Sequence, residues 1–193
     1  SDLAALERQL DAEDCSAVLV EIVQGEGGVR ALDADYLKAV EALCHEKNVL
    51  FCVDEVQTGN GRTGTWFAYE QFGLSPDLVS TAKGLGNGLP IGATLMGSKT
   101  AEVLTPGTHG STFGGNPVAC AGALSVLEQI DDAFLEAVKQ KGAWLTAELE
   151  KIPGVKDVSG LGLMLGFSVE GCKSADIKAK ALDNGLVVLT AKD

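Results

Sequence analysis

The stretch VLFCVDEVQTGNGRTG, residues 49–64, contains the pattern that decides the fold. Its first five residues are apolar without a break, and the run ends at Asp54 before a glycine-rich loop. A strand that is apolar on both faces is typical of a parallel sheet, because helices cover both faces of such a sheet. The preceding segment, residues 33–44, has apolar residues at helical spacing behind a capping residue, Asp33. The sequence therefore predicts a β-α-β crossover and an α/β fold.

Two further segments of strand type lie about one crossover unit away, one on each side. Residues 17–20 precede Glu21, and residues 77–80 lie shortly before Lys83. Ligands of an open parallel sheet gather at the carboxyl ends of its strands, so we expect Glu21, Asp54 and Lys83 at one edge. A lysine beside a carboxylate favours imine chemistry, because a desolvated lysine amine forms Schiff bases with aldehydes. Pyridoxal phosphate, an aldehyde, also needs a carboxylate opposite its ring nitrogen.

Composition limits the classes of partner. The chain has 193 residues and a formal net charge of −12, so we expect neither nucleic acid nor an anionic membrane as a partner. No apolar stretch approaches the ~20 residues of a membrane span. The five cysteines form no C-x-x-C pair, which indicates free thiols in a reducing cytoplasm. His45 and His109 have no second ligand at suitable spacing, so we expect no metal site.

The second half of the chain predicts two helices and then a smaller unit. Asn116-Pro117 is a capping residue followed by proline at the first helical position. Pro153-Gly154 marks the expected boundary between one domain at 1–152 and another at 153–193. The expected elements around this boundary are helices at 118–130, 133–151 and 175–183, and strands at 155–159, 163–169 and 186–189.

Four blocks of the sequence, in the same order, resemble class III aminotransferases, which are pyridoxal-phosphate enzymes. These blocks are residues 20–28, 50–64, 80–93 and 109–117. Within the class, residues 112–117 and 161–166 are most similar to the acetylornithine aminotransferases. The resemblance implies the large domain of fold-type-I enzymes, with a mainly parallel sheet. Residues 1–152 would be the second half of that domain with its linking helices, and 153–193 the start of a small C-terminal α/β domain.

The resemblance also implies an activity. The intact protein would transfer the terminal amino group of N-acetylornithine to 2-oxoglutarate, within arginine biosynthesis, as a homodimer with a shared active site. Ornithine, succinylornithine and 4-aminobutyrate are alternative amino donors, because the same lysine and aspartate serve all of them. A further alternative is that this chain alone is a truncated, non-catalytic fragment, since both of its ends look cut.

The matching positions carry the family's cofactor roles. Lys83 would hold pyridoxal phosphate covalently and move the proton between substrate and cofactor carbons. Asp54 would pair with the ring nitrogen, Val56 would pack on one ring face and Gln57 would contact the 3-oxygen of the ring. Thr112 would bind the phosphate of the neighbouring subunit's cofactor.

Substrate recognition is only partly represented in the chain. Glu26 matches the glutamate that pairs with the arginine for the substrate carboxylate, and Glu21 is a neighbouring acid. That arginine would lie beyond Asp193, and the family's first half would supply another phosphate loop and a ring-stacking aromatic. Arg62 has two interpretations, a clamp for a carboxylate or a stabiliser of its loop or of the dimer interface. Asn87 stands where the family commonly has glycine.

Overall fold

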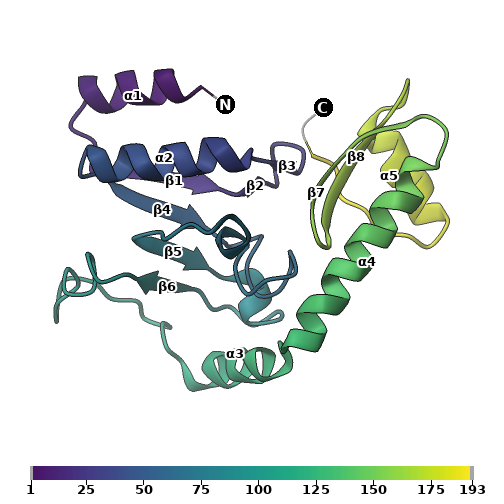
Figure 1. Cartoon of the computed structure of the whole chain (residues 1–193). Helices are drawn as coiled ribbons and strands as arrows, with labels where there is room; N and C mark the ends of the chain where they lie inside the picture. Colours follow the sequence, from purple (N-terminus) through teal and green to yellow (C-terminus); the bar gives the residue numbers. More distant parts are fainter. Residues whose placement is uncertain (1, 192–193) are drawn as a thin grey trace.

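The computed structural model describes residues 2–191, which fold around a four-stranded sheet (Figure 1). The strand order is β1-β4-β5-β6. Strands β1, β4 and β5 are parallel and β6 is antiparallel to β5, so the predicted mainly parallel α/β sheet is confirmed. The bounds of these strands are Ala17–Glu21 for β1, Leu50–Asp54 for β4, Leu78–Thr81 for β5 and Ala93–Met96 for β6.

The other elements surround the sheet or extend from it. In Figure 1, α1 and α2 lie along one side, while α4 runs from α3 towards a unit of β7, β8 and α5. Strands β2 and β3 form one antiparallel pair, and β7 and β8 form another. The bounds are α1 Leu3–Ala12, β2 Val23–Gln24, β3 Arg30–Ala31, α2 Ala34–Glu46, η1 Ala68–Phe72, η2 Lys83–Leu85, α3 Pro117–Gln129, α4 Asp132–Glu150, β7 Val155–Leu161, β8 Met164–Val169 and α5 Ser174–Asp183.

Side-chain caps set the starts of four helices. The side chains of Asp2, Asp33, Asn116 and Asp131 each accept a hydrogen bond from the backbone N–H three residues later. Each such cap contributes about 1 kcal/mol, because it satisfies a donor that the first turn leaves without a partner. These short polar residues therefore determine where α1, α2, α3 and α4 begin.

The core lies between α2 and the centre of the sheet. Leu37 and Val40 on α2 are fully buried, as are Phe51 and Val53 on β4. Burial of each such side chain contributes roughly 1.5–3 kcal/mol. Helix α1 lies outside this layer and has no buried residue, although Asp11 in it pairs with Lys47 at 2.6 Å.

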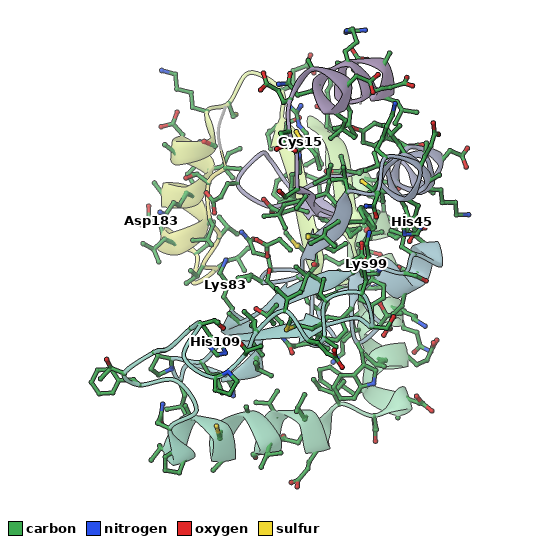
Figure 2. The ribbon with its side chains drawn as sticks, turned by 90° about the vertical axis from the view of Figure 1, so that its left-hand side faces the viewer. Cys15, His45, Lys83, Lys99, His109 and Asp183 are labelled. Carbon is green, nitrogen blue, oxygen red and sulfur yellow. The ribbon has the colours of Figure 1, made fainter. Side chains whose placement is uncertain are left out.

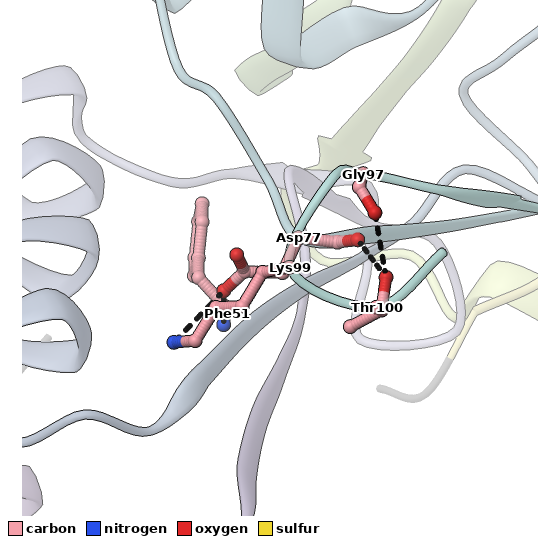
Figure 3. Close-up of polar contacts among 5 residues, drawn as sticks. All are labelled: Phe51, Asp77, Gly97, Lys99 and Thr100. Carbon is pink, nitrogen blue, oxygen red and sulfur yellow. Dashed lines mark hydrogen bonds and ion pairs between the residues drawn. The ribbon is translucent and has the colours of Figure 1, made fainter. Parts of the chain in front are cut away.

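Asp77 ties together the amino ends of β4 and β5 and the end of β6 (Figure 3). Its Oδ2 accepts from the backbone N–H of Phe51 at 2.9 Å, and its own N–H donates to the carbonyl of Phe51 at 2.8 Å. Its carbonyl oxygen accepts from the Thr100 hydroxyl at 3.0 Å and from the Gly97 N–H at 2.9 Å. Lys99 Nζ lies 3.9 Å from Asp77 Oδ2. This end of the sheet is thus held by one residue that uses both its backbone and its side chain.

The strand expected at residues 186–189 is wrong. This segment is neither helix nor strand, and Val187 and Leu189 are 76% and 88% exposed. A strand needs a neighbour to complete its backbone hydrogen bonds, and no strand within residues 2–191 pairs with this segment. Within the same residues, no helix combines the length and apolarity that a membrane span requires.

Candidate active site

A cavity of about 1260 Å³ lies where the loops after β2, β4 and β5 meet the β7–β8 hairpin and the C-terminal segment. Four of the predicted site residues line it: Glu26, Val56, Gln57 and Lys83. In the view of Figure 2, Lys83 lies above His109 and below the yellow helix α5. The structure therefore brings most of the predicted site together from three separate loops.

The backbone at Lys83 is held in an uncommon conformation. Strand β5 ends at Thr81, and Lys83 begins the 3-10 helix η2 with a φ of 42°. The Asn60 side chain donates to the Thr81 hydroxyl at 2.9 Å and to the Ala82 carbonyl at 3.3 Å, which braces the turn. A left-handed non-glycine residue persists only where its surroundings hold it, and such residues cluster at functional sites. The turn thus presents Lys83 at the cavity wall.

Asp54 and Glu21 lie side by side at the same edge of the sheet. They are the last residues of β4 and β1 and are register partners, and Ser80 of β5 is the partner on the other side of Asp54. Asp54 is half-buried and accepts from the Val56 N–H at 2.9 Å. Both carboxylates line a smaller hollow of about 410 Å³ together with Tyr36, whereas Lys83 lines the larger cavity.

The Gln57 side chain lies against the glycine turn that carries Glu26. A Cβ atom added to Gly25 would collide with Gln57 Oε1, so the Gln57 amide is in close contact with this glycine. The Gly25 N–H donates to the Glu21 carboxylate at 3.3 Å. Gly25 therefore joins three predicted site residues, and the sequence pattern alone did not indicate this contact.

Glu55 is a buried acid that sequence reasoning missed. It is fully buried, and its carboxylate accepts from the Thr58 hydroxyl and, at 2.9 Å, from the Tyr69 N–H. Burial raises the pKa of Glu55, and the hydrogen bonds from Thr58 and from the backbone of Ala68 and Tyr69 only partly oppose this. The carboxylate thus anchors the loop that presents Val56. The available signal was a second acid directly after a wholly apolar strand, with threonine three residues later.

The basic side chains around the cavity outnumber the acidic ones. Arg30, Arg62 and Lys83 line it with Glu26 and Asp157, although the whole chain is strongly acidic. A local excess of positive charge suits anionic groups such as phosphates and carboxylates.

Arg62 is held by its backbone, while its side chain is exposed at the cavity. Its carbonyl oxygen accepts from the Leu163 N–H at 3.0 Å, which ties the β4 loop to the β7–β8 turn. Next to it, Gly162 approaches the Thr63 backbone closely: an added Cβ would lie 2.6 Å from the Thr63 carbonyl carbon. These contacts join the C-terminal unit to the central sheet.

Thr112 lies outside both cavities, in an exposed segment between β6 and α3. Its predicted role concerns a neighbouring subunit, and its position is open to such a partner. Among residues 2–191, no group of three or more histidine, cysteine, aspartate or glutamate side chains is arranged to hold a metal ion.

Known proteins resemble this chain over its whole length. The family model for class-III aminotransferases matches residues 1–193. The acetylornithine aminotransferase of Haemophilus ducreyi is 51% identical over 193 residues, which are 100% of this chain and 49% of that protein. The crystal structure of N-acetylornithine aminotransferase from Stenotrophomonas maltophilia has a TM-score of 0.87 at 37% identity, covering 98% of this chain and 52% of that one.

The structure of a third relative has PLP at its active site. The ornithine aminotransferase of Toxoplasma gondii, described with partial occupancy of PLP at its active site, has a TM-score of 0.87 at 37% identity. That match covers 99% of this chain and 47% of the other. The chain thus spans about half the length of the relatives it matches. With a family model that matches from end to end and a fold shared with these enzymes, the chain belongs to the class-III aminotransferases.

Proposed function

We propose that the complete protein is a pyridoxal-phosphate-dependent aminotransferase that transfers the terminal amino group of N-acetylornithine to 2-oxoglutarate, within arginine biosynthesis. The observation that carries the proposal is the cavity that Lys83 shares with Val56, Gln57 and Glu26. The 51% identity to an acetylornithine aminotransferase supports this amino donor over the alternatives. We also retain the boundary between residues 152 and 153 as a proposal.

The residues present fit the cofactor. The cavity offers one lysine amine and an excess of basic side chains for an anionic ligand, and the neighbouring strand ends in Asp54. When bound, pyridoxal phosphate supplies an electron sink for the charge left on a substrate carbon that loses its proton. Lys83 Nζ would hold the cofactor, remove this proton as a general base and return it. Asp54 would keep the ring nitrogen protonated.

Two other side chains would orient the ring. Val56 would pack on one face of the ring, and Gln57 would hydrogen-bond to the 3-oxygen. The contact of Gln57 with Gly25 and the anchoring of this loop by Glu55 support a defined position for both. Preorganised polar groups of this kind act without reorganisation at the moment of reaction.

A homodimer with a shared active site is the state that we propose for the working enzyme. Thr112 would reach the phosphate of the partner's cofactor. Exposed apolar side chains next to it in the sequence and on the following helix α3 support an interface there: Phe113, Val118 and Leu124 are 81%, 69% and 60% exposed. Apolar surface gathered in this way is typical of protein contacts.

Glu26 would pair with the arginine that binds the substrate carboxylate, with Glu21 as a neighbouring acid. The alternative amino donors are ornithine, succinylornithine and 4-aminobutyrate.

The five free cysteines support a reducing compartment, the cytoplasm. We propose no nucleic-acid or membrane partner for a chain of this charge.

The test uses the full-length protein with added pyridoxal phosphate. We expect a visible absorbance band that borohydride reduction abolishes. The reduction attaches the cofactor irreversibly to Lys83, and peptide mass spectrometry identifies the modified residue. Turnover is then compared among N-acetylornithine, ornithine, succinylornithine and 4-aminobutyrate, with 2-oxoglutarate as acceptor. Trapping of the cofactor at another lysine would refute the role of Lys83. Faster turnover of another amino donor would show that N-acetylornithine is not the preferred substrate.

The same assay on the 193-residue chain alone tests the second possibility, that this piece is non-catalytic by itself. We expect no turnover from it, because the family's first half supplies part of the cofactor site. Measurable turnover would refute the fragment interpretation and leave the enzyme assignment intact.

A further inference from the structure

The loop that carries Glu26 is a tight turn between β2 and β3. The N–H groups of Gly28 and Val29 both donate to the Gly25 carbonyl, at 3.2 and 3.1 Å. Glu26 lies within this turn and lines the large cavity. The conformation of residues 25–29 therefore decides where the Glu26 carboxylate lies.

Val29 has an unfavourable backbone conformation. Its φ is 55°, in the left-handed region. A β-branched residue is a genuine outlier there, because its side chain crowds the backbone. Left to itself the turn would relax, so neighbouring groups must hold it.

The β7–β8 hairpin supplies those groups. The Ser159 hydroxyl donates to the Val29 carbonyl at 2.7 Å, across 130 residues of sequence. Gly166 leaves room for the valine, since an added Cβ would lie 2.8 Å from the Val29 Cβ. On the other side of the turn, the Gln57 amide lies against Gly25. The turn is thus clamped between the β4 loop and the hairpin.

We propose that Ser159 is a positioning residue that holds Val29 in its left-handed conformation and thereby keeps Glu26 in place to pair with the arginine that binds the substrate carboxylate. This inference rests on the proposed function, because the role of Glu26 does. Ser159 acts through the turn, so its effect must depend on Val29 and on Glu26.

The kinetic test compares Ser159→Ala, Glu26→Gln and the double variant in the full-length enzyme. We expect Ser159→Ala to raise KM for N-acetylornithine about fivefold, the effect of losing one typical hydrogen bond, with kcat within about twofold. In the Glu26→Gln background, Ser159→Ala should change KM by less than about twofold. If Ser159→Ala raises KM as much in the Glu26→Gln background as in the wild type, the inference is overturned. Ser159→Thr keeps a hydroxyl and should restore KM to near the wild-type value.

Hydrogen–deuterium exchange tests the clamp without any activity. We expect Ser159→Ala to speed hydrogen exchange in the peptide containing Gly28 and Val29, because the hydrogen bonds of their backbone N–H groups open more often. Adding Val29→Asn should slow it again, because asparagine tolerates positive φ. Ser168→Ala is the matched control, since the Ser168 hydroxyl donates within the hairpin, to the Lys156 carbonyl and the Asp157 carboxylate.

The outcomes separate the two proposals. An active wild type in which Ser159→Ala leaves this exchange unchanged would overturn the inference alone. A full-length protein without transaminase activity would overturn the proposed function and the role of Glu26 with it, while exchange would still report whether Ser159 holds Val29.

Discussion

The two ends of the central sheet are built in opposite ways. At the amino end, Asp77 makes four hydrogen bonds to Phe51, Thr100 and Gly97 with ordinary backbone geometry. At the carboxyl end, Lys83 and Val29 have left-handed backbones and glycines leave room for close contacts. Stability and chemistry are thus separated along the same strands. At the carboxyl end the strained Lys83 and Val29 line the large cavity, and at the amino end the hydrogen bonds of Asp77 hold the strands together.

Removing the amine at the carboxyl end tests this separation most directly. Lys83→Ala should lower kcat by at least about 10³-fold, since it removes both the covalent attachment and the general base. The free energy of unfolding should change by less than about 0.5 kcal/mol, because the side chain is exposed. Steady-state kinetics and urea unfolding measure the two effects.

Lys99→Ala is the matched control, since it removes an exposed lysine at the other end of the sheet. It should leave kcat within about twofold of the wild type, as expected for a surface change away from the site. Comparable losses of kcat in both variants would contradict the separation.

At the amino end, Asp77→Ala should lower the free energy of unfolding and leave kcat nearly unchanged. The Phe51 N–H loses its acceptor, which costs about 1–3 kcal/mol when the donor is buried. The kcat of the folded enzyme should stay within about twofold. Chemical denaturation gives the free energy, and Asp77→Asn, which keeps an acceptor oxygen, should lose less. A fall in kcat without a fall in stability would show that this end takes part in the chemistry.

Glu55 is a buried acid at the carboxyl end, so its contribution to stability should depend on pH. Its pKa is raised above 4.5 by burial, so the folded state holds the proton more tightly than the unfolded state. The stability this provides is fully present below about pH 4.5 and is lost as pH rises through the folded pKa. The melting temperature of the wild type relative to Glu55→Gln should therefore fall as pH rises from 4 to 8.

Glu150→Gln, which removes an exposed acid from α4 that does not act on the pKa of Glu55, serves as the control and should show no comparable drift. A difference between wild type and Glu55→Gln that is independent of pH would mean that Glu55 does not titrate in this range.

The smallest expected effect is in thiol reactivity near Asp77. Burial, followed by the charge of Asp77, raises the pKa of Cys44 from 9.0 to about 11. At pH 8 this leaves about 100-fold less thiolate than at an ordinary cysteine, so a thiol reagent should modify exposed Cys172 first. Asp77→Ala should speed modification of Cys44 by loosening this end. Labelling followed by peptide mapping decides it, and equal rates for both cysteines would contradict the tight amino end.

The sheet and most site positions were predictable because their signals are local. Short segments with apolar residues that end in a polar residue located β1, β4 and β5 to within a residue or two. Parallel strands then require Glu21 and Asp54 to be neighbours, as their register confirms. The strand at 186–189 was wrong because an apolar run carries no information about whether a partner strand is available.

Contacts across long stretches of sequence were not predictable. Ser159 bonds to Val29 over 130 residues, and neither residue belongs to a pattern that indicates the other. The sequence also did not show that Asp54 and the adjacent Glu55 have different environments; this required the tertiary structure. Successive residues at a strand end point to opposite sides, and only the packing of Thr58 and Tyr69 shows which acid is buried.

The sequence by itself determined the class of fold, the order of the loops that reach the active edge, and the lysine presented there. These depend on hydrophobic periodicity, caps and glycines, which act over a few neighbouring residues. Only the tertiary structure decided that the β7–β8 hairpin closes the cavity and holds the Glu26 turn, and that one residue secures the opposite end. Such contacts arise because distant segments pack together, and close packing selects partners by shape and hydrogen bonding in space.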